Sequence, residues 1–374
     1  MSLLLPNMIQ SIEIHNFKNL SGLKIPGFSR VNLISGKNNV GKSSLLEALE
    51  IHIANSSIVP ILESRGELYK TYSPGDGIDL FKQNYEALSS LFTGRNGNAD
   101  DGNNVMAIND GRNLLSMQFR RYTVVKEEDN NALTRQRIVF SPGKDFPDGD
   151  VRTGLVVERG ARGKVMFQLE HRLDRLDSGD SSRRPDIARH IKIEPDFNDS
   201  ALVSRLWDSI ALTDKEDYVI GALKIIEPGI ESLAFLESPA YKKDRYPVAR
   251  IAGVNHRIPL RSMGDGINHI LCIILSLVNC EDGCVLIDEI DNGLHYTVQK
   301  QLWGVVFDLA AKLNVQVFAT THSSDCISSF GKVACMNESA GKYIRLEYRA
   351  GSVRAVEYDA GELEIVAAQN IEIR

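Results

Sequence analysis

Residues Val31 to Leu49 read VNLISGKNNVGKSSLLEAL, and this stretch decides the fold. An apolar, strand-like run leads into the segment from Gly36 to Ser43, which fits the pattern G-x-x-x-x-G-K-[ST], and a helix is predicted from Ser44 onward. The two glycines permit backbone conformations that turn successive N–H groups toward a phosphate, and the N-terminus of the helix adds partial positive charge. The stretch therefore predicts a phosphate-binding loop between a strand and a helix.

The same loop carries side chains suited to a nucleotide. Lys42 is expected to reach the β- and γ-phosphate oxygens, and the hydroxyl of Ser43 is expected to ligate Mg²⁺. No Asn-Lys-x-Asp motif for reading guanine occurs, so the expected cofactors are ATP and Mg²⁺. The other candidate nucleotide-binding residues of the loop are Gly36, Asn38, Asn39, Gly41 and Ser44.

A second nucleotide element is predicted around residue 288. The apolar run Cys284 to Ile287 is typical of a buried strand, and it ends in Asp288 and Glu289. Two acids at the end of such a strand form a Walker B arrangement, in which Asp288 would hold the Mg²⁺ shell and Glu289 would polarise the attacking water. Asp288 joins Ser43 as a candidate metal ligand, and Glu289 is a candidate catalytic residue.

A second catalytic candidate follows the next predicted strand. Val315 to Ala319 is apolar and leads into Thr320-Thr321-His322-Ser323. Ligands bind at the carboxyl ends of strands in α/β sheets, so His322 is placed where it could donate a hydrogen bond to the γ-phosphate or to the attacking water. The alternative for an isolated histidine at this place is a helix-capping or solvated role.

Composition limits the class of protein. The chain has 374 residues, 43% of them apolar, which suffices for a sizeable core, and a net charge of −6 disfavours a generally basic nucleic-acid binder. No apolar run approaches the roughly 20 residues of a membrane helix, and no signal peptide is recognisable, so we expect a cytoplasmic protein without membrane contact. The five cysteines lack C-x-x-C spacing and are expected to be core thiols.

The order of predicted elements divides the chain into three parts. Residues 1–55 hold two antiparallel strands and the phosphate-loop half of the core, residues 56–199 an inserted β-rich lobe, and residues 200–374 the second half of the core. No heptad repeat predicts a coiled coil, and the tail after His322 is too short for an appended nuclease domain. The predicted details include loops at 94–111 and 178–182, strands at 332–336, 343–348 and 353–358, and a terminal helix from residue 360.

Four motifs in order, GKNNVGKS, SMGDG, LIDEIDNGLH and FATTHSS, together with the turn Phe17-Lys18-Asn19, resemble the ATPases of the RecF/SMC/OLD superfamily. More narrowly, they resemble the stand-alone ATP-binding proteins related to the OLD family that occur in phage-defence operons. The resemblance covers about residues 9–54 and 211–374. It implies an α/β, ABC-type ATPase head: a phosphate-loop core sheet flanked by helices, an N-terminal antiparallel β-lobe, no long coiled coil and no Toprim domain.

The resemblance also assigns roles. Ser262, Gly264 and Gly266 would face the γ-phosphate held by a second copy of the chain, Asp291 would lie in the D-loop, and His322 would be the switch histidine. Two departures stand out. Asn39 replaces a glycine that is usual in the loop, which moves the match toward the OLD-like branch. No Q-loop glutamine can be assigned, although Gln83 and Gln118 are candidates.

The resulting hypothesis is an ATPase that forms a homodimer on ATP, with a larger oligomer also open, and that controls a separate effector protein, such as a nuclease or toxin, in phage defence. A RecF-like ATPase of DNA repair is the first alternative, and the ATP-binding subunit of a transporter is the less favoured one. DNA or RNA could bind through the inserted lobe, because Lys and Arg outnumber Asp and Glu between residues 152 and 192. A solvated face of mixed charge explains that stretch as well.

Overall fold

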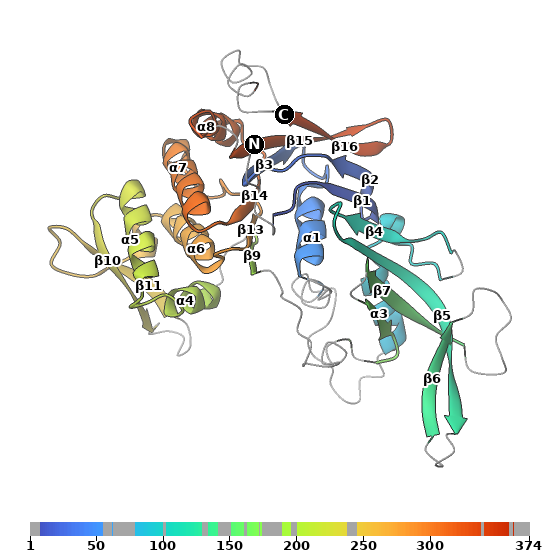
Figure 1. The fold of residues 1–374 in the computed structure, drawn as a ribbon. Coiled ribbons are helices and arrows are strands. Elements are labelled where there is room, and N and C mark those ends of the chain that lie inside the picture. Colours follow the sequence, from blue (N-terminus) through green and yellow to red (C-terminus); the bar gives the residue numbers. More distant parts are fainter. Residues whose placement is uncertain are drawn as a thin grey trace.

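A computed structural model of the chain describes residues 8–54, 62, 79–99, 102–128, 134–140, 151–160, 163–171, 173, 189–195, 200–237, 245–337, 340–358 and 362. Two large sheets dominate the fold, with helices between and beside them (Figure 1). Within this described part, no helix is long and apolar enough to cross a membrane. The longest described helix has 17 residues, so no long coiled coil is present there.

A six-stranded sheet carries the phosphate loop. Its order is β16-β15-β3-β14-β13-β9, and every neighbouring pair is parallel except β15 and β16. The strands are β3 (Val31–Gly36), β9 (His190–Ile193), β13 (Cys284–Ile287), β14 (Gln316–Thr320), β15 (Gly341–Arg349) and β16 (Ser352–Tyr358).

The central strands are buried on both faces, which is why they read as continuous apolar runs. Side chains alternate between two cores: Val285 and Ile287 point into one, and Leu286 points into the other. The first core is completed by α4 (Ser200–Asp208), α5 (Asp214–Ile226), α6 (Asp265–Asn279), α7 (Tyr296–Lys312) and α8 (Ser324–Ala334), and the second by α1 (Lys42–Ile53).

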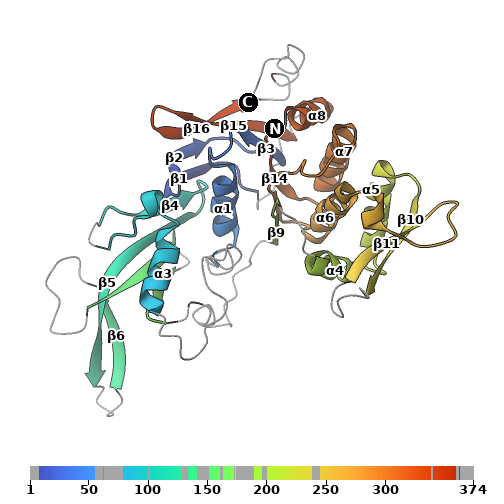
Figure 2. The same ribbon diagram turned by 180° about the vertical axis from the view of Figure 1, so that it is seen from behind.

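The second large sheet is antiparallel and covers the α1 side of the core (Figures 1 and 2). Its order is β2-β1-β4-β5-β7-β8, with β6 paired to the far end of β5, so that β5 and β6 project from the body as a two-stranded ribbon. α3 (Leu80–Ser89) packs in the same core. The strands are β1 (Ile12–Phe17), β2 (Leu20–Ile25), β4 (Met106–Asn109), β5 (Leu114–Glu128), β6 (Thr134–Phe140), β7 (Arg152–Arg159) and β8 (Gly163–Gln168).

A small third sheet lies beyond α5, as both views show (Figures 1 and 2). It consists of β10 (Ile230–Glu237), β11 (Arg245–Ile251) and β12 (Ile258–Pro259). β12 runs directly into a 3₁₀ turn over Leu260–Met263, which precedes α6. A second 3₁₀ turn spans Thr93–Arg95.

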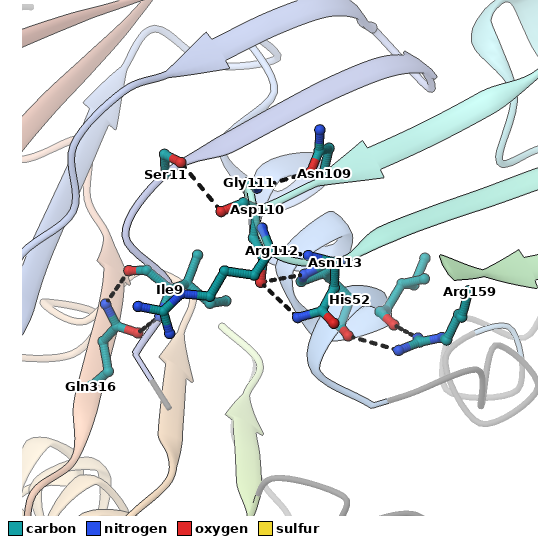
Figure 3. A network of polar contacts seen from close by, with 11 residues as sticks. Ile9, Ser11, His52, Asn109, Asp110, Gly111, Arg112, Asn113, Arg159 and Gln316 are labelled. Atoms are coloured by element: carbon teal, nitrogen blue, oxygen red, sulfur yellow. Dashed lines mark hydrogen bonds and ion pairs between the residues drawn. The ribbon is translucent and has the colours of Figure 1, made fainter. Parts of the chain in front are cut away.

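Polar contacts fasten the antiparallel sheet to the last turn of α1 (Figure 3). Asp110, in the turn between β4 and β5, lies 3.0 Å from Nε2 of His52. Arg159, at the end of β7, donates to the carbonyl oxygens of Ile51 at 2.8 Å and His52 at 3.2 Å. These carbonyls lack partners within the helix, so the lobe caps the helix that begins with the phosphate loop.

The observed fold confirms the predicted class, an α/β core sheet carrying a phosphate loop with an N-terminal antiparallel lobe. Two local predictions were wrong. The strand predicted at 332–336 lies in α8 and the turn after it, because Ile327, Phe330 and Ala334 form an apolar helical face against the core. The loop predicted at 94–111 contains β4, whose alternate residues Met106 and Ile108 are buried between β1 and β5.

Two other local predictions, the loop at 178–182 and most of the helix from residue 360, fall outside the described residues. The start of α5 is capped by a shifted form of the capping box. Thr213 accepts a hydrogen bond from the N–H of Lys215 at 3.3 Å, while the Glu216 carboxylate accepts from the N–H of Leu212 at 2.8 Å.

Candidate functional site

The carboxyl ends of four parallel strands meet at one edge of the core sheet. β3 ends in the phosphate loop, β14 leads to His322, β13 leads to Asp288, and β9 leads to Glu194. In open α/β sheets this edge is where ligands bind. The sheet therefore brings the phosphate loop together with the predicted Walker B acids and the predicted switch histidine.

The phosphate loop has the backbone conformation that a phosphate requires. Gly36, Asn39 and Gly41 have φ values of 148°, 61° and 112°, all positive. A Cβ at Gly36 would lie 2.5 Å from the carbonyl oxygen of Leu346 in β15, so the strand-to-loop turn excludes larger residues. The backbone is thus bent sharply at the point where its N–H groups would surround an anion.

Lys42 closes this loop on itself. Its Nζ donates to the carbonyl oxygens of Gly36 at 2.8 Å and Lys37 at 3.2 Å, and the residue is only 8% exposed. Burial lowers the pKa of Lys42 from its ordinary value, while the charges of Glu289 and Asp288 act in the opposite direction. A bound phosphate would add negative charge beside the ammonium group and favour its protonated form.

The two Walker B acids are oriented by one threonine. Thr320 Oγ1 donates to Oδ1 of Asp288 at 2.5 Å and accepts from the N–H of Glu289 at 2.8 Å. Asp288 is buried, whereas the side chain of Glu289 is 35% exposed. Glu289 also has a φ of 54°, an unusual conformation for a residue with a side chain, and such strain is often found at functional sites.

The segment after β14 lies beside Glu289 and contacts the D-loop. His322 Nδ1 lies 3.6 Å from Oε1 of Glu289, which is close to, but longer than, a hydrogen bond. Thr321 donates a 2.5 Å hydrogen bond to Asp291. The His322 side chain is 54% exposed and therefore open to a ligand.

Ser262 to Gly266, the SMGDG motif, is called the signature loop below. In the described part of the chain it contacts the D-loop. A Cβ at Gly266 would lie 2.7 Å from the carbonyl oxygen of Gly293, so the start of α6 packs directly on the D-loop. Gly264, with a φ of 112°, opens to free space, and exposed Ser262 donates to the carbonyl oxygen of Pro259 at 2.7 Å.

The turn between β1 and β2 supports the phosphate loop, although the sequence alone gave it no defined partner. Asn19 Nδ2 donates to the carbonyl oxygen of Asn39 at 3.3 Å, and a Cβ at Gly41 would lie 2.9 Å from that same nitrogen. Lys18 pairs with Glu47 of α1 at 2.6 Å. The turn thus supports Asn39, the residue with positive φ in the middle of the phosphate loop.

Sequence reasoning missed the end of β9. Gln83 lies in α3 and Gln118 lies in β5, where it donates to the carbonyl oxygen of Gly102, so neither is at the ligand-binding edge of the sheet. The residue that follows β9 at that edge is Glu194. The alternation of apolar and charged residues from Ile191 to Glu194 was the signal of a half-buried strand that could have identified it.

The donor set at this edge fits a magnesium-bound nucleotide. Ser43 is exposed at the start of α1 and offers a hydroxyl, and Asp288 offers a carboxylate. Mg²⁺ prefers such hard oxygen ligands and is usually held by one or two carboxylates together with substrate phosphates. The bent, glycine-containing loop and the Lys42 ammonium group supply the matching place for the phosphates.

A phosphate loop, two acids at the end of a buried strand and a histidine after the next strand lie at one edge of the core sheet, and this arrangement fits an ATPase. The family described as "AAA ATPase domain" matches residues 8–130 and 190–327, which is more than half of the chain. The chain belongs to that family. The chain is therefore an ATPase, as predicted from the sequence.

Individual proteins show more distant likeness. An ATP/GTP phosphatase of Helicobacter pylori is 22% identical over 347 residues, which cover 87% of this chain and 88% of the relative. An SMC head bound to the C-winged helix domain of ScpA has a TM-score of 0.49 at 12% identity, covering 94% of this chain and 97% of that chain. The SMC head domain from Thermotoga maritima has a TM-score of 0.42 at 12% identity, covering 94% and 98%.

Proposed function

We propose that this ATPase works as a homodimer that closes on two molecules of ATP. The observation that carries the proposal is the exposed start of α6, which offers Gly264 and Ser262 to solvent while Gly266 packs on the D-loop. A helix N-terminus with free N–H groups suits a γ-phosphate, and the chain's own phosphate loop is a separate element. Two such half-sites per chain are satisfied by a two-fold dimer.

Each residue then has a definable task. Lys42 would bind the β- and γ-phosphate oxygens, exchanging its two carbonyl partners for them. Ser43 and Asp288 would hold Mg²⁺, which when bound neutralises charge on the phosphates. Glu289 would orient and deprotonate the attacking water, and His322, 3.6 Å from Glu289, would donate a hydrogen bond to the γ-phosphate.

Hydrolysis would remove the γ-phosphate and with it the contacts made by the signature loop of the second copy. The dimer would then loosen, so nucleotide state would set assembly state. The remaining nucleotide candidates, Asn38 and Ser44, lie in the loop and in the first turn of α1. Their backbone N–H groups would face the phosphates.

Light scattering tests this mechanism. Glu289→Gln keeps the size of the side chain but removes the base, so this variant should hold a mass of two chains with ATP and Mg²⁺ and one chain without ATP. Adding Gly264→Glu should keep the variant monomeric, because charge and bulk would block the open space at the signature loop. If ATP leaves the mass unchanged in Glu289→Gln, the closed dimer is ruled out.

We further propose that the dimer controls a separate effector protein in cytoplasmic phage defence. The support is Asn39, which makes the phosphate loop resemble that of the OLD-like proteins. The ribbon of β5 and β6 supports an attachment role, because it projects away from the core in both views (Figures 1 and 2). Replacing residues 124–138 by a short turn should spare ATP hydrolysis but abolish protection of cells that carry the complete operon. Retained protection would contradict this role, and loss of DNA binding instead would favour the repair alternative.

A further inference from the structure

The helix α6 contacts the segment after the Walker B acids at two places. Gly266, in its first turn, lies so close to Gly293 that a Cβ would be 2.7 Å from the carbonyl oxygen of that residue. His269, three residues later, points Nε2 at the carbonyl oxygen of Ile290, 3.2 Å away. Residues three apart lie on the same face of a helix, so one face of α6 is docked on residues 290–293.

His269 is a buried side chain with a defined hydrogen-bonding role. It is 6% exposed, and burial lowers the pKa of its ring, so the imidazole is neutral near pH 7. A carbonyl oxygen can only accept, so Nε2 must carry the proton and donate it to the oxygen of Ile290. Ile290 is only 1% exposed, and the ring therefore gives its carbonyl group a partner where water has little access.

The hydrogen bonds around Glu289 show what this contact holds. Glu289 has a φ of 54°, which is costly for a residue with a side chain and persists only when its surroundings enforce it. Its N–H donates to Oγ1 of Thr320 at 2.8 Å, and the N–H of Ile290 donates to the carbonyl oxygen of Thr320 at 3.0 Å. β14 thus holds two successive N–H groups, and His269 holds the carbonyl group that follows them.

We propose that His269 is a positioning residue for Glu289. By fixing the carbonyl group of Ile290, it keeps the backbone of Glu289 in its strained conformation and the carboxylate aimed at the attacking water. The inference rests on the proposed role of Glu289 as the base. Because α6 also carries the signature loop, the helix that would contact the γ-phosphate of a second copy sets the geometry of the base in its own copy.

The proposal predicts a specific kinetic defect. Loss of the hydrogen bond should lower kcat, because the carboxylate is misplaced. Affinity for ATP should stay the same, because the phosphate loop lies on β3 and α1 rather than on α6. A misplacement of about 1 Å can cost roughly 100-fold in rate, so a loss of about 10–100-fold in kcat is expected.

A pair of variants isolates the hydrogen bond. Methionine and glutamine are similar in length, but only glutamine carries an N–H donor, so His269→Met removes the bond and His269→Gln can replace it. We expect kcat to fall about 10–100-fold in His269→Met and less than about threefold in His269→Gln, with unchanged binding of a fluorescent, non-hydrolysable ATP analogue. Ser276→Ala is the control and should keep the parent kcat, since Ser276 is a fully buried polar residue of the same helix whose hydroxyl lies 3.9 Å from Sγ of Cys272.

A double-mutant cycle with Glu289→Gln separates positioning from a general loss of structure. If His269 acts through Glu289, adding His269→Met to Glu289→Gln should not lower the residual single-turnover hydrolysis any further. Three results would overturn the inference: equal kcat in His269→Met and His269→Gln, loss of analogue binding in His269→Met, or a further loss of hydrolysis in the double variant. If instead Glu289→Gln alone hydrolyses ATP as fast as the parent, the proposed function itself fails, so the two failures are distinguishable.

Discussion

The hydroxyl of Thr320 donates a 2.5 Å hydrogen bond to Asp288 from the neighbouring strand. Thr320 is fully buried, and its oxygen also accepts the backbone N–H of Glu289. One side chain of β14 therefore orients the candidate metal ligand and the candidate base of β13. This relationship makes Thr320 a positioning residue that no nucleotide motif identifies.

Thr320→Val should test that role, because valine keeps the shape and removes the hydroxyl. We expect kcat or Mg²⁺ affinity to fall about 10–100-fold, as is usual for residues that orient metal ligands. Steady-state hydrolysis at varied Mg²⁺ measures both. Thr297→Val, which removes an exposed hydroxyl bonded to His295, is the control and should leave both values unchanged.

Lys42→Ala should abolish nucleotide binding. Its ammonium group is buried within the loop and is the cation closest to the expected phosphates, so no neighbouring side chain can replace it. Calorimetric titration with ATP and Mg²⁺ measures the loss. Lys37→Ala, at an exposed position of the same loop, should bind nearly as well as the parent, and equal binding by Lys42→Ala would contradict the assignment.

Gly266→Ala should uncouple the signature loop from the D-loop. The added Cβ would lie 2.7 Å from the carbonyl oxygen of Gly293, which forces one of the two loops to move. We expect ATP to bind each chain normally but to fail to assemble the Glu289→Gln dimer in light scattering. Gly221→Ala in α5, where a Cβ meets nothing within 4 Å, should instead assemble normally and gain roughly 0.5–1 kcal/mol of stability.

Asp110→Asn should weaken the clamp between the antiparallel lobe and α1. Against the effect of burial, hydrogen bonds from His52 and from the backbone N–H groups of Asn113 and Arg112 lower the pKa of Asp110 below its ordinary value of 3.8. A lowered pKa stabilises the folded state above pH 3.8, and this contribution is lost as pH falls toward the folded pKa.

The free energy of unfolding of Asp110→Asn should accordingly be about 1.5–3 kcal/mol smaller than that of the parent at pH 7. Urea denaturation at pH 7 and pH 3 measures the difference, which should shrink at pH 3. A difference that is the same at both pH values would show that the carboxylate charge is not what fastens the lobe.

The sequence by itself determined the nucleotide chemistry, because the phosphate loop and the Walker B strand are local patterns. The run from Val31 to Ser43 folds as strand, turn and helix, since its glycines and apolar residues allow little else. The strand before Asp288 could likewise be predicted from its continuous apolar run. For this reason the class of fold and the ATPase activity could both be predicted.

Only the tertiary structure decided which residues accompany these motifs. Thr320 and Asn19 contact the site through residues far away in sequence, at positions fixed by the parallel register of β13 and β14 and by the packing of the β1–β2 turn on the phosphate loop. β4 escaped prediction for the same reason, as its burial comes from β1 and β5 on either side. Local patterns record which conformation a segment prefers, whereas the energy of a strand or a site depends on partners that only the folded chain brings together.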